Sequence, residues 1–284
     1  MSQKVIIIGA PRSGTNMLRN VLTRLPGMET WPCDEINYIW RHGNALYPSD
    51  EFPLKFARPE VVHYIRGQFD KFFHSSNCQY VVEKTCANSL RVDFVDAILP
   101  DAKYLFIYRD GLDVVSSAMK RWKAELDIPY LFAKIRFVPV PDLPFYGLHY
   151  LWNRMHRLLS RDKRLAYWGP RLTGMDPLLS QYDLSEICAL QWQRCVESAQ
   201  QSFDSMPAGK VVQVRYEDFV KDGPEELARI CDFLGRSGSK ELIKKALCGV
   251  SAQSVGKGHN ELGAERLSRI LPLIGKTLER YGYL

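Results

Sequence analysis

A glycine-bearing turn near the start of the chain has the residue types and spacing of a phosphate-binding loop. It follows a β-branched run at residues 5–8 and precedes apolar residues that recur at helical spacing from Asn16 onward. A strand, a glycine turn and a helix in this order direct backbone N–H groups toward one anion. We therefore expect the following residues to bind a phosphate group: Pro11, Arg12, Ser13, Gly14, Thr15 and Asn16.

The residues inside this turn indicate which kind of anion it binds. In nucleotide-hydrolysing loops a lysine reaches the β- and γ-phosphates and the next hydroxyl binds Mg²⁺. Thr15 and Asn16 occupy those two positions here, and the cation within the turn is Arg12. This pattern predicts a metal-free site in which a guanidinium neutralises a nucleotide-borne group.

A second anion site is expected after the strand predicted at residues 103–108. Arg109 lies at the carboxyl end of that strand, where open α/β sheets bind ligands. Ser117 follows eight residues later, on the second turn of the next predicted helix. A surface ion pair between Arg109 and Asp110 is the alternative interpretation.

Together these two motifs resemble those of the sulfotransferases that use 3′-phosphoadenosine 5′-phosphosulfate (PAPS) as donor. Residues 11–16 look like the family's 5′-phosphosulfate loop, and residues 104–117 look like its 3′-phosphate motif. The resemblance spans the chain but is weak between residues 127 and 182. It implies that Arg12 neutralises the 5′ group, that Arg109 and Ser117 bind the 3′-phosphate, and that adenosine 3′,5′-bisphosphate (PAP) is the product, without a metal.

The acceptor side of the site is expected near Lys84, at the end of the strand predicted at residues 80–85. Residues 83–85 resemble the Glu-Lys-Thr/Ser-Pro segment of glycan sulfotransferases, in which the lysine lies near the transferred group. Cys86 stands where that branch has proline and where the phenol and steroid branch has a histidine base. An unperturbed thiol is a weaker candidate base, because its ionisation would place a second anion beside the sulfonate.

Glu35 is therefore the expected general base. It occupies the place of the glutamate that glycan sulfotransferases use, and burial can tune a carboxylate for proton transfer. The alternative role for Glu35 is a helix first-turn residue stabilised by the helix dipole. Weaker candidate bases are Asp34, Glu29, His149 and His156.

Two later segments resemble parts of the family's nucleotide site. Tyr216 begins a Tyr-Glu-Asp segment like the one whose tyrosine lies against the adenine. Lys257, within Val-Gly-Lys-Gly, resembles the late basic loop that closes on the 3′-phosphate, although the usual flanking arginine or tryptophan is missing. The resemblance thus adds Tyr216 and Lys257 to the nucleotide-binding residues.

The order of predicted elements favours an α/β fold with a parallel β-sheet flanked by helices, because buried strands alternate with helices. We expect Asp34 to cap a short helix, Ser89 to cap a helix ending near Leu99, and residues 263–281 to form the last helix. The 284 residues suit a single domain, 1–284. Residues 127–182, rich in proline and aromatic side chains, are expected to form a substrate-side insertion or lid, with an accessory packing element as the alternative.

Composition limits the partners and the compartment. The net charge is +6, but lysine and arginine are dispersed, so a nucleic-acid partner is not indicated. The seven cysteines show no CxxC pair, which is typical of free thiols and gives no zinc motif. Because no leader or membrane-spanning run is evident, we expect a cytoplasmic enzyme without an integral membrane segment. The oligomeric state is undetermined by the sequence.

Three functions follow in order of support. The first is transfer of a sulfuryl group from PAPS to a hydroxyl of a carbohydrate or small-molecule acceptor, in line and without metal. The second is a P-loop kinase or NTPase, which the loop residues disfavour. The third is a nucleotide-binding module without catalysis. The joint presence of five residues speaks against it: Arg12, Arg109, Ser117, Lys84 and Glu35.

Overall fold

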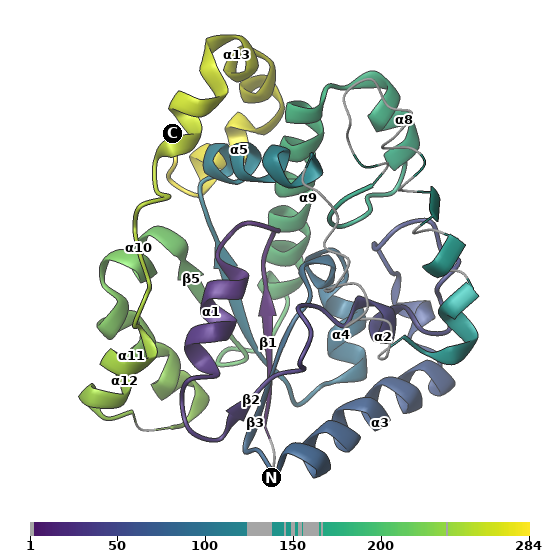
Figure 1. Ribbon diagram of the computed structural model, residues 1–284, viewed down its shortest axis with the longest axis vertical. Helices are drawn as coiled ribbons and strands as arrows, with labels where there is room; N and C mark the ends of the chain where they lie inside the picture. The colour runs from purple at the N-terminus through teal and green to yellow at the C-terminus, as the bar shows by residue number, and fades with distance from the viewer. Residues whose placement is uncertain are drawn as a thin grey trace.

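A five-stranded parallel sheet runs through the centre of the computed structural model (Figure 1). The structure describes residues 3–123, 138–144, 146–148, 151–152, 155, 165, 167–236 and 238–284. Its strand order is β2-β3-β1-β4-β5, and every neighbouring pair is parallel. The predicted α/β fold is therefore confirmed. The strands are β1 (Gln3–Ile8), β2 (Met28–Glu29), β3 (Tyr80–Lys84), β4 (Lys103–Tyr108) and β5 (Val211–Arg215).

Helices connect these strands and cover both faces of the sheet (Figure 1). The α-helices are α1 (Thr15–Leu22), α2 (Asn37–Arg41), α3 (Pro59–Ser76), α4 (Val92–Ile98), α5 (Gly111–Trp122), α8 (Met175–Gln181), α9 (Leu184–Asp204), α10 (Tyr216–Lys221), α11 (Gly223–Leu234), α12 (Lys240–Ala246) and α13 (Lys257–Arg280). Three short 3₁₀ helices are η1 (Leu54–Phe56), η2 (Cys86–Leu90) and η3 (Val140–Asp142).

The alternation of side chains along β1 divides the core into two layers. Ile6 and Ile8 face a core shared with α3, α4, α9 and α13, whereas Val5 and Ile7 face one shared with α1, α11 and α12. All four side chains are fully buried, as expected for a central strand covered on both sides. The sheet is thus a rigid support for whatever its strand ends carry.

The register places the candidate residues at one edge of this sheet. Ile7 pairs with Lys84, and Tyr108 pairs with Arg215, so β1, β3, β4 and β5 all end at the same side. Lys84, Arg109 and Tyr216 therefore emerge at the edge where the loop after β1 turns into α1. Ligands bind at this carboxyl edge in open parallel sheets.

Two capping predictions are wrong. Helix α2 begins after Ile36 with no side-chain cap, because the Asp34 carboxylate accepts a hydrogen bond from the Arg19 guanidinium (2.8 Å) instead. Ser89 lies inside η2, where its hydroxyl donates to the Cys86 carbonyl (2.6 Å), and the next helix begins only at Val92. The two-residue strand β2 was also not predicted, because two residues are too few to show the alternation of apolar and polar side chains that marks a strand.

The predicted last helix, residues 263–281, forms the second part of α13. Helix α13 consists of two helical segments that meet at a kink at Gly263, whose φ of 73° and ψ of 164° are not helical and whose positive φ favours glycine. The first segment, residues 257–262, was not predicted. Lys257, predicted in a loop, is the first residue of this helix.

The segment expected to form a substrate-side insertion is described only in part. Its residues 124–137 and several between 145 and 166 lie outside the described residues, as do the weaker base candidates His149 and His156. The described parts contain η3 and α8, and residue Leu165 donates its N–H to the Trp122 carbonyl (3.1 Å). Its role toward a substrate stays a prediction.

Buried charged side chains connect the chain near residue 171 to the segment before α3. Asp50, 2% exposed, accepts hydrogen bonds from Arg41 (2.7 Å), Arg91 (3.3 Å) and the Arg171 backbone N–H (2.9 Å). Burial opposes ionisation of Asp50, but Arg91 and Arg41 outweigh it and lower its pKa. The carboxylate thereby joins the loop before α3 to the chain near residue 171.

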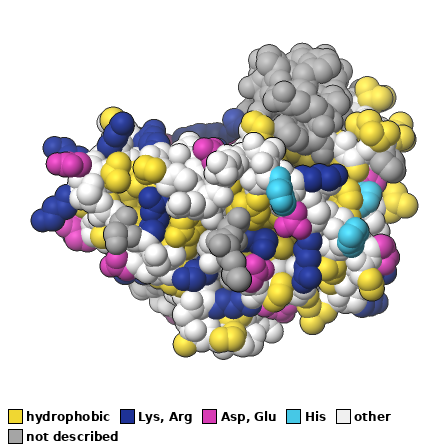
Figure 2. All heavy atoms as spheres, turned by 90° about the horizontal axis from the view of Figure 1, so that it is seen from below, with side chains coloured by type: hydrophobic (Ala, Val, Ile, Leu, Met, Phe, Trp, Pro, Cys, Tyr) yellow, Lys and Arg dark blue, Asp and Glu magenta, His cyan; other side chains and the backbone are white. Residues whose placement is uncertain are grey.

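Charged side chains of both signs share the surface. On the face seen in Figure 2, lysine and arginine are interspersed with aspartate and glutamate. No helix of the described residues is long and apolar enough to cross a membrane.

Candidate active site

The loop between β1 and α1 has the backbone geometry of an anion-binding turn. Arg12 and Gly14 both have positive φ (72° and 89°), and the Ser13 N–H donates to the Ala10 carbonyl (3.2 Å). Gly9 packs so closely under β4 that a Cβ there would lie 2.4 Å from the Ile107 carbonyl oxygen. Since Gly14 caps α1 without a side chain, the first N–H groups of that helix are left for a ligand.

Arg12 lies beside the second predicted anion site. Its Nε donates to the Ser117 Oγ (2.9 Å), and its carbonyl accepts from Arg109 Nη1 (3.3 Å). Burial, followed by the positive charges of Arg121 and Arg109, lowers the pKa of Arg12. An anion bound beside Arg12 would offset this repulsion and favour its charged form. The structure thus brings both predicted phosphate-binding motifs together.

Two buried polar atoms at this site have no hydrogen-bond partner within the described part of the chain. They are the Ser13 Oγ, in the loop, and the Arg109 Nε. A buried polar atom without a partner costs about 1–3 kcal/mol. Because both atoms can donate a hydrogen bond, oxygen atoms of phosphate or sulfate groups would satisfy them. The residues present therefore fit a nucleotide that carries more than one such group.

Tyr216 and Trp192 hold the site from two sides. The Tyr216 ring lies against the loop, since a Cβ at Gly14 would be 2.4 Å from its Cδ2, and the Arg109 guanidinium lies 4.4 Å from the ring centroid. The Trp192 Nε1, on α9, donates to the Arg109 carbonyl (3.1 Å). Tyr216 is predictable from the sequence, whereas Trp192 is not, because its contact depends on packing between distant segments.

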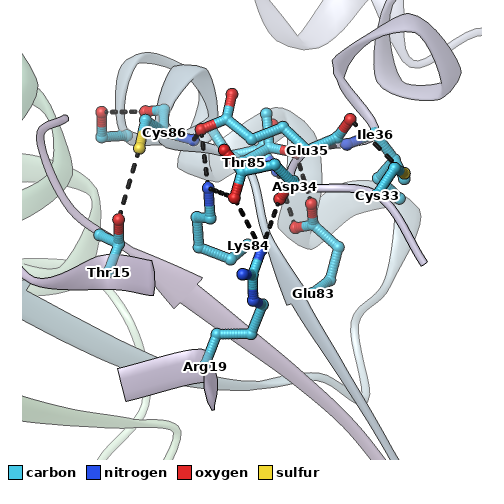
Figure 3. Close-up of polar contacts among 12 residues, drawn as sticks. Thr15, Arg19, Cys33, Asp34, Glu35, Ile36, Glu83, Lys84, Thr85 and Cys86 are labelled. Atoms are coloured by element: carbon cyan, nitrogen blue, oxygen red, sulfur yellow. Dashed lines mark hydrogen bonds and ion pairs between the residues drawn. The ribbon is translucent and has the colours of Figure 1, made fainter. Parts of the chain in front are cut away.

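Lys84 forms the centre of a second cluster at the same sheet edge (Figure 3). Its side chain is 1% exposed, and its Nζ donates to the Glu35 Oε1 (3.0 Å) and the Asp34 Oδ1 (3.2 Å). The Cys86 N–H also donates to Glu35 Oε1 (3.4 Å), and Arg19 supports Asp34 from below in the view of Figure 3. The predicted lysine and the predicted base are therefore in direct contact.

The charges of this cluster stabilise one another. Burial opposes ionisation of Asp34, but Lys84 and Arg19 lower its pKa to about 2. Burial likewise opposes the charged form of Lys84, but the nearby Glu35 and other negative groups raise its pKa above the ordinary lysine value. At neutral pH Lys84 is thus a cation, and Asp34 a carboxylate.

Cys86 adjoins the cluster as a buried neutral group. Burial, then the negative charge of Glu35, raises its pKa well above the ordinary thiol value. Its Sγ lies 3.6 Å from the Thr15 Oγ1 of the loop (Figure 3). A thiolate base is disfavoured here, in line with the lower rank the sequence analysis gave Cys86.

Two other predicted site residues, Glu29 and Lys257, lie away from this cluster. Glu29 pairs with Val81, three residues before Lys84 along β3, which places it about 10 Å from that strand end. Lys257 is exposed at the start of α13, where the preceding loop meets α5. Among the described residues no group of three His, Cys, Asp or Glu side chains could hold a metal ion.

Known proteins share a family sequence pattern and a fold with this chain. The sequence model of the sulfotransferase family matches residues 4–136 and 149–239. The sulfotransferase domain from the curacin biosynthetic pathway superposes with a TM-score of 0.52 at 14% identity, over 97% of this chain and 98% of that one. Sulfotransferase STF9 from Mycobacterium avium superposes with a TM-score of 0.57 at 11% identity, over 98% and 76%. At these identities the structures show a shared fold. No curated protein sequence matches the chain significantly.

Proposed function

The chain belongs to the PAPS-dependent sulfotransferase family, and from this premise we propose that it transfers a sulfuryl group from PAPS to a hydroxyl of a carbohydrate or small molecule. One observation carries the proposal. The loop arginine, Arg12, and the strand-end arginine, Arg109, meet at one sheet edge, beside the contact between Lys84 and Glu35. A donor site and a proton-transfer site are thus adjacent.

The donor would bind across the two arginines. In this proposal Arg12 and the N–H groups of residues 13–16 hold the 5′ end, where charge develops as the sulfuryl group leaves. Arg109, Ser117 and Lys257 hold the 3′-phosphate, and Tyr216 lies against the adenine. The unpartnered Ser13 Oγ and Arg109 Nε support this arrangement, because each gains a hydrogen bond from the nucleotide.

Lys84 and Glu35 would serve the acceptor. The Glu35 carboxylate takes the proton of the acceptor hydroxyl as the oxygen attacks sulfur. The new S–O bond forms while the S–O bond to the 5′-phosphate breaks, and PAP leaves. Lys84, held charged by its carboxylate neighbours, stabilises the negative charge on the sulfuryl oxygens. Positioning in line by the sheet edge supplies the rest.

The acceptor is proposed as a class. The likeness of residues 83–85 to glycan sulfotransferases and a glutamate base favour a carbohydrate or a glycosylated small molecule. Aromatic side chains of the segment 127–182 suit a phenol, lipid or polyketide alcohol equally well, because aromatic faces stack on sugars and rings alike. A screen of these acceptors with radiolabelled PAPS separates the two, and a labelled product from either class supports the proposal.

A reducing compartment is the proposed setting. All seven cysteines lie within the described residues, and none forms a disulfide, although five are buried. Free thiols persist where glutathione and thioredoxin keep them reduced. This supports the proposal of a cytoplasmic enzyme.

Thermal shift distinguishes this function from the alternatives. PAP in EDTA should raise the melting temperature, whereas ATP with Mg²⁺ should leave it unchanged. A P-loop kinase or NTPase would give the reverse result. PAP binding without sulfuryl transfer to any acceptor of the screen would favour a nucleotide-binding module without catalysis.

A further inference from the structure

Asp113 is a buried carboxylate that faces the proposed 3′-phosphate site from the first turn of α5. It is 4% exposed, and three N–H donors point at its two oxygens. Its Oδ2 accepts from Arg109 Nη2 (2.9 Å) and the Gly256 N–H (2.9 Å), and its Oδ1 accepts from the Gly258 N–H (2.7 Å). One side chain thus contacts an arginine and a loop nearly 150 residues apart in the chain.

The loop that Asp113 holds carries the late basic residue. Lys257 lies between Gly256 and Gly258, so both backbone neighbours of the lysine are fixed by the same carboxylate. Gly258 packs so tightly on α5 that a Cβ there would lie 2.3 Å from the Leu112 carbonyl carbon. The position of Lys257 at the start of α13 therefore depends on this contact.

Further bonds join the loop to Arg109. The Arg109 Nη2 donates to the Ser254 carbonyl (2.5 Å), and the Ser254 Oγ bonds the Tyr216 hydroxyl (2.8 Å). With Nη2 occupied in this way, the buried Nε of Arg109 is the guanidinium atom left without a partner within the described part of the chain. Asp113 therefore sets which edge of the guanidinium faces a ligand.

We propose that Asp113 is a positioning residue for 3′-phosphate recognition. It aligns Arg109 and the loop around Lys257 as one unit, and its own negative charge is offset by three N–H donors, so it does not repel the phosphate. The inference rests on the proposed function and deepens it, because this unit would select nucleotides that carry a 3′-phosphate. An asparagine cannot replace Asp113, because its amide presents one oxygen and an NH₂ group to three donors.

A second contact between α5 and α13 provides a matched control. Glu261 of α13 accepts hydrogen bonds from Ser116 and from Lys120 (2.7 Å) of α5. It joins the same two helices as Asp113 does, and besides its bonds to Lys120 and Ser116 the nearby charge of Lys257 lowers its pKa. Replacing it by glutamine should therefore loosen the helix contact without weakening the preference for PAP.

The experiment compares calorimetric Kd values for PAP and for adenosine 5′-phosphate, in EDTA, because the two nucleotides differ only in the 3′-phosphate. We expect the wild-type protein to prefer PAP by at least about a hundredfold, the sum of several charge-assisted bonds. Asp113→Asn should raise the Kd for PAP about ten- to a hundredfold and leave the Kd for adenosine 5′-phosphate within about twofold of the wild-type value. Glu261→Gln should keep the wild-type ratio.

A second variant covers the case in which Asp113→Asn does not fold. Gly258→Ala forces the loop away from α5 without altering any charge, and it should also reduce the preference for PAP about tenfold or more. An unchanged preference in a folded Asp113→Asn or Gly258→Ala protein would overturn the inference. Equal weakening of both nucleotides would overturn it too, since that is the effect of a merely structural residue. A wild-type protein that does not bind PAP would refute the proposed function instead.

Discussion

Glu35→Gln separates proton transfer from donor binding more cleanly than any other substitution in the site. Glutamine keeps the shape of the side chain, and its Oε1 can still accept from Lys84 and from the Cys86 N–H, which lie 3.0 and 3.4 Å from the glutamate oxygen. What it loses is the ability to accept a proton. Lys84 stays partly compensated, because Asp34 lies 3.2 Å from its Nζ.

The expected size of the effect follows from the role. A general base contributes about 10²–10⁴-fold to a rate, so kcat with saturating PAPS should fall by that factor. The Kd for PAP should stay within about twofold, because the proposed nucleotide ligands, Arg12 and Arg109 among them, do not touch Glu35. Initial rates with radiolabelled PAPS measure the first quantity, and titration calorimetry measures the second.

Asp34→Asn is the matched control for this prediction. Asp34 contacts the same lysine but is also held by Arg19 at 2.8 Å, which favours a role in the ion-pair network. We expect its kcat to fall by less than about tenfold, with a lower melting temperature. Turnover of Glu35→Gln within about threefold of wild type, or a larger loss in Asp34→Asn than in Glu35→Gln, would refute the assignment of the base.

Three other substitutions test the supporting structure. Gly14→Ala puts a Cβ 2.4 Å from the Tyr216 ring at a φ of 89°, so calorimetry should show PAP affinity reduced by about tenfold or more; unchanged affinity would contradict the loop geometry. Asp50→Ala leaves Arg41 and Arg91 buried without their shared carboxylate, so urea titration should show a free energy of unfolding about 3–5 kcal/mol lower than in wild type. A loss below about 1 kcal/mol would contradict a stabilising role for these buried ion pairs. Burial raises the pKa of Glu83 from 4.5 to about 7. Between these two values the folded protein retains a proton that the unfolded chain releases, so the free energy of unfolding falls as the pH rises. Glu83→Gln removes this term, and its stability relative to wild type should grow by about 3 kcal/mol between pH 4.5 and 8, whereas parallel pH curves would contradict the shift.

The parts of the site that follow from local sequence were predictable. A strand, a glycine turn and a helix in succession specify the loop of residues 9–15, and parallel strands must end at one edge, which places Lys84 and Arg109 near it. No property beyond order and spacing is needed for this. The direct bond between Glu35 and Lys84 was not predicted, and their roles in catalysis stay predictions.

Features that depend on packing between distant segments were not predictable. Asp113 lies in the first turn of α5, and Arg109 lies just before that helix, so their ion pair is local in the chain. The bonds of Asp113 to Gly256 and Gly258, however, arise only when α13 docks on α5. The contact of Trp192 with the Arg109 carbonyl has the same origin.

The capping errors have a related cause. Hydroxyl and carboxylate groups cap helices when nothing closer competes for them. Asp34 has Arg19 and Lys84 within 3.2 Å, and Ser89 has the Cys86 carbonyl at 2.6 Å. Both competitors are set by the fold, so the sequence pattern alone indicates caps that do not form.

A crystal structure of the protein with PAP, grown in EDTA, would show whether one edge of the sheet binds both phosphates of the nucleotide. We expect the 5′-phosphate within hydrogen-bond distance of Arg12 and the N–H groups of residues 13–16. We expect the 3′-phosphate on Arg109, Ser117 and Lys257, with the Ser13 Oγ and Arg109 Nε both bonded. A nucleotide bound at another edge of the sheet, or one that contacts Arg12 but leaves Arg109 without a phosphate, would refute the proposed donor site.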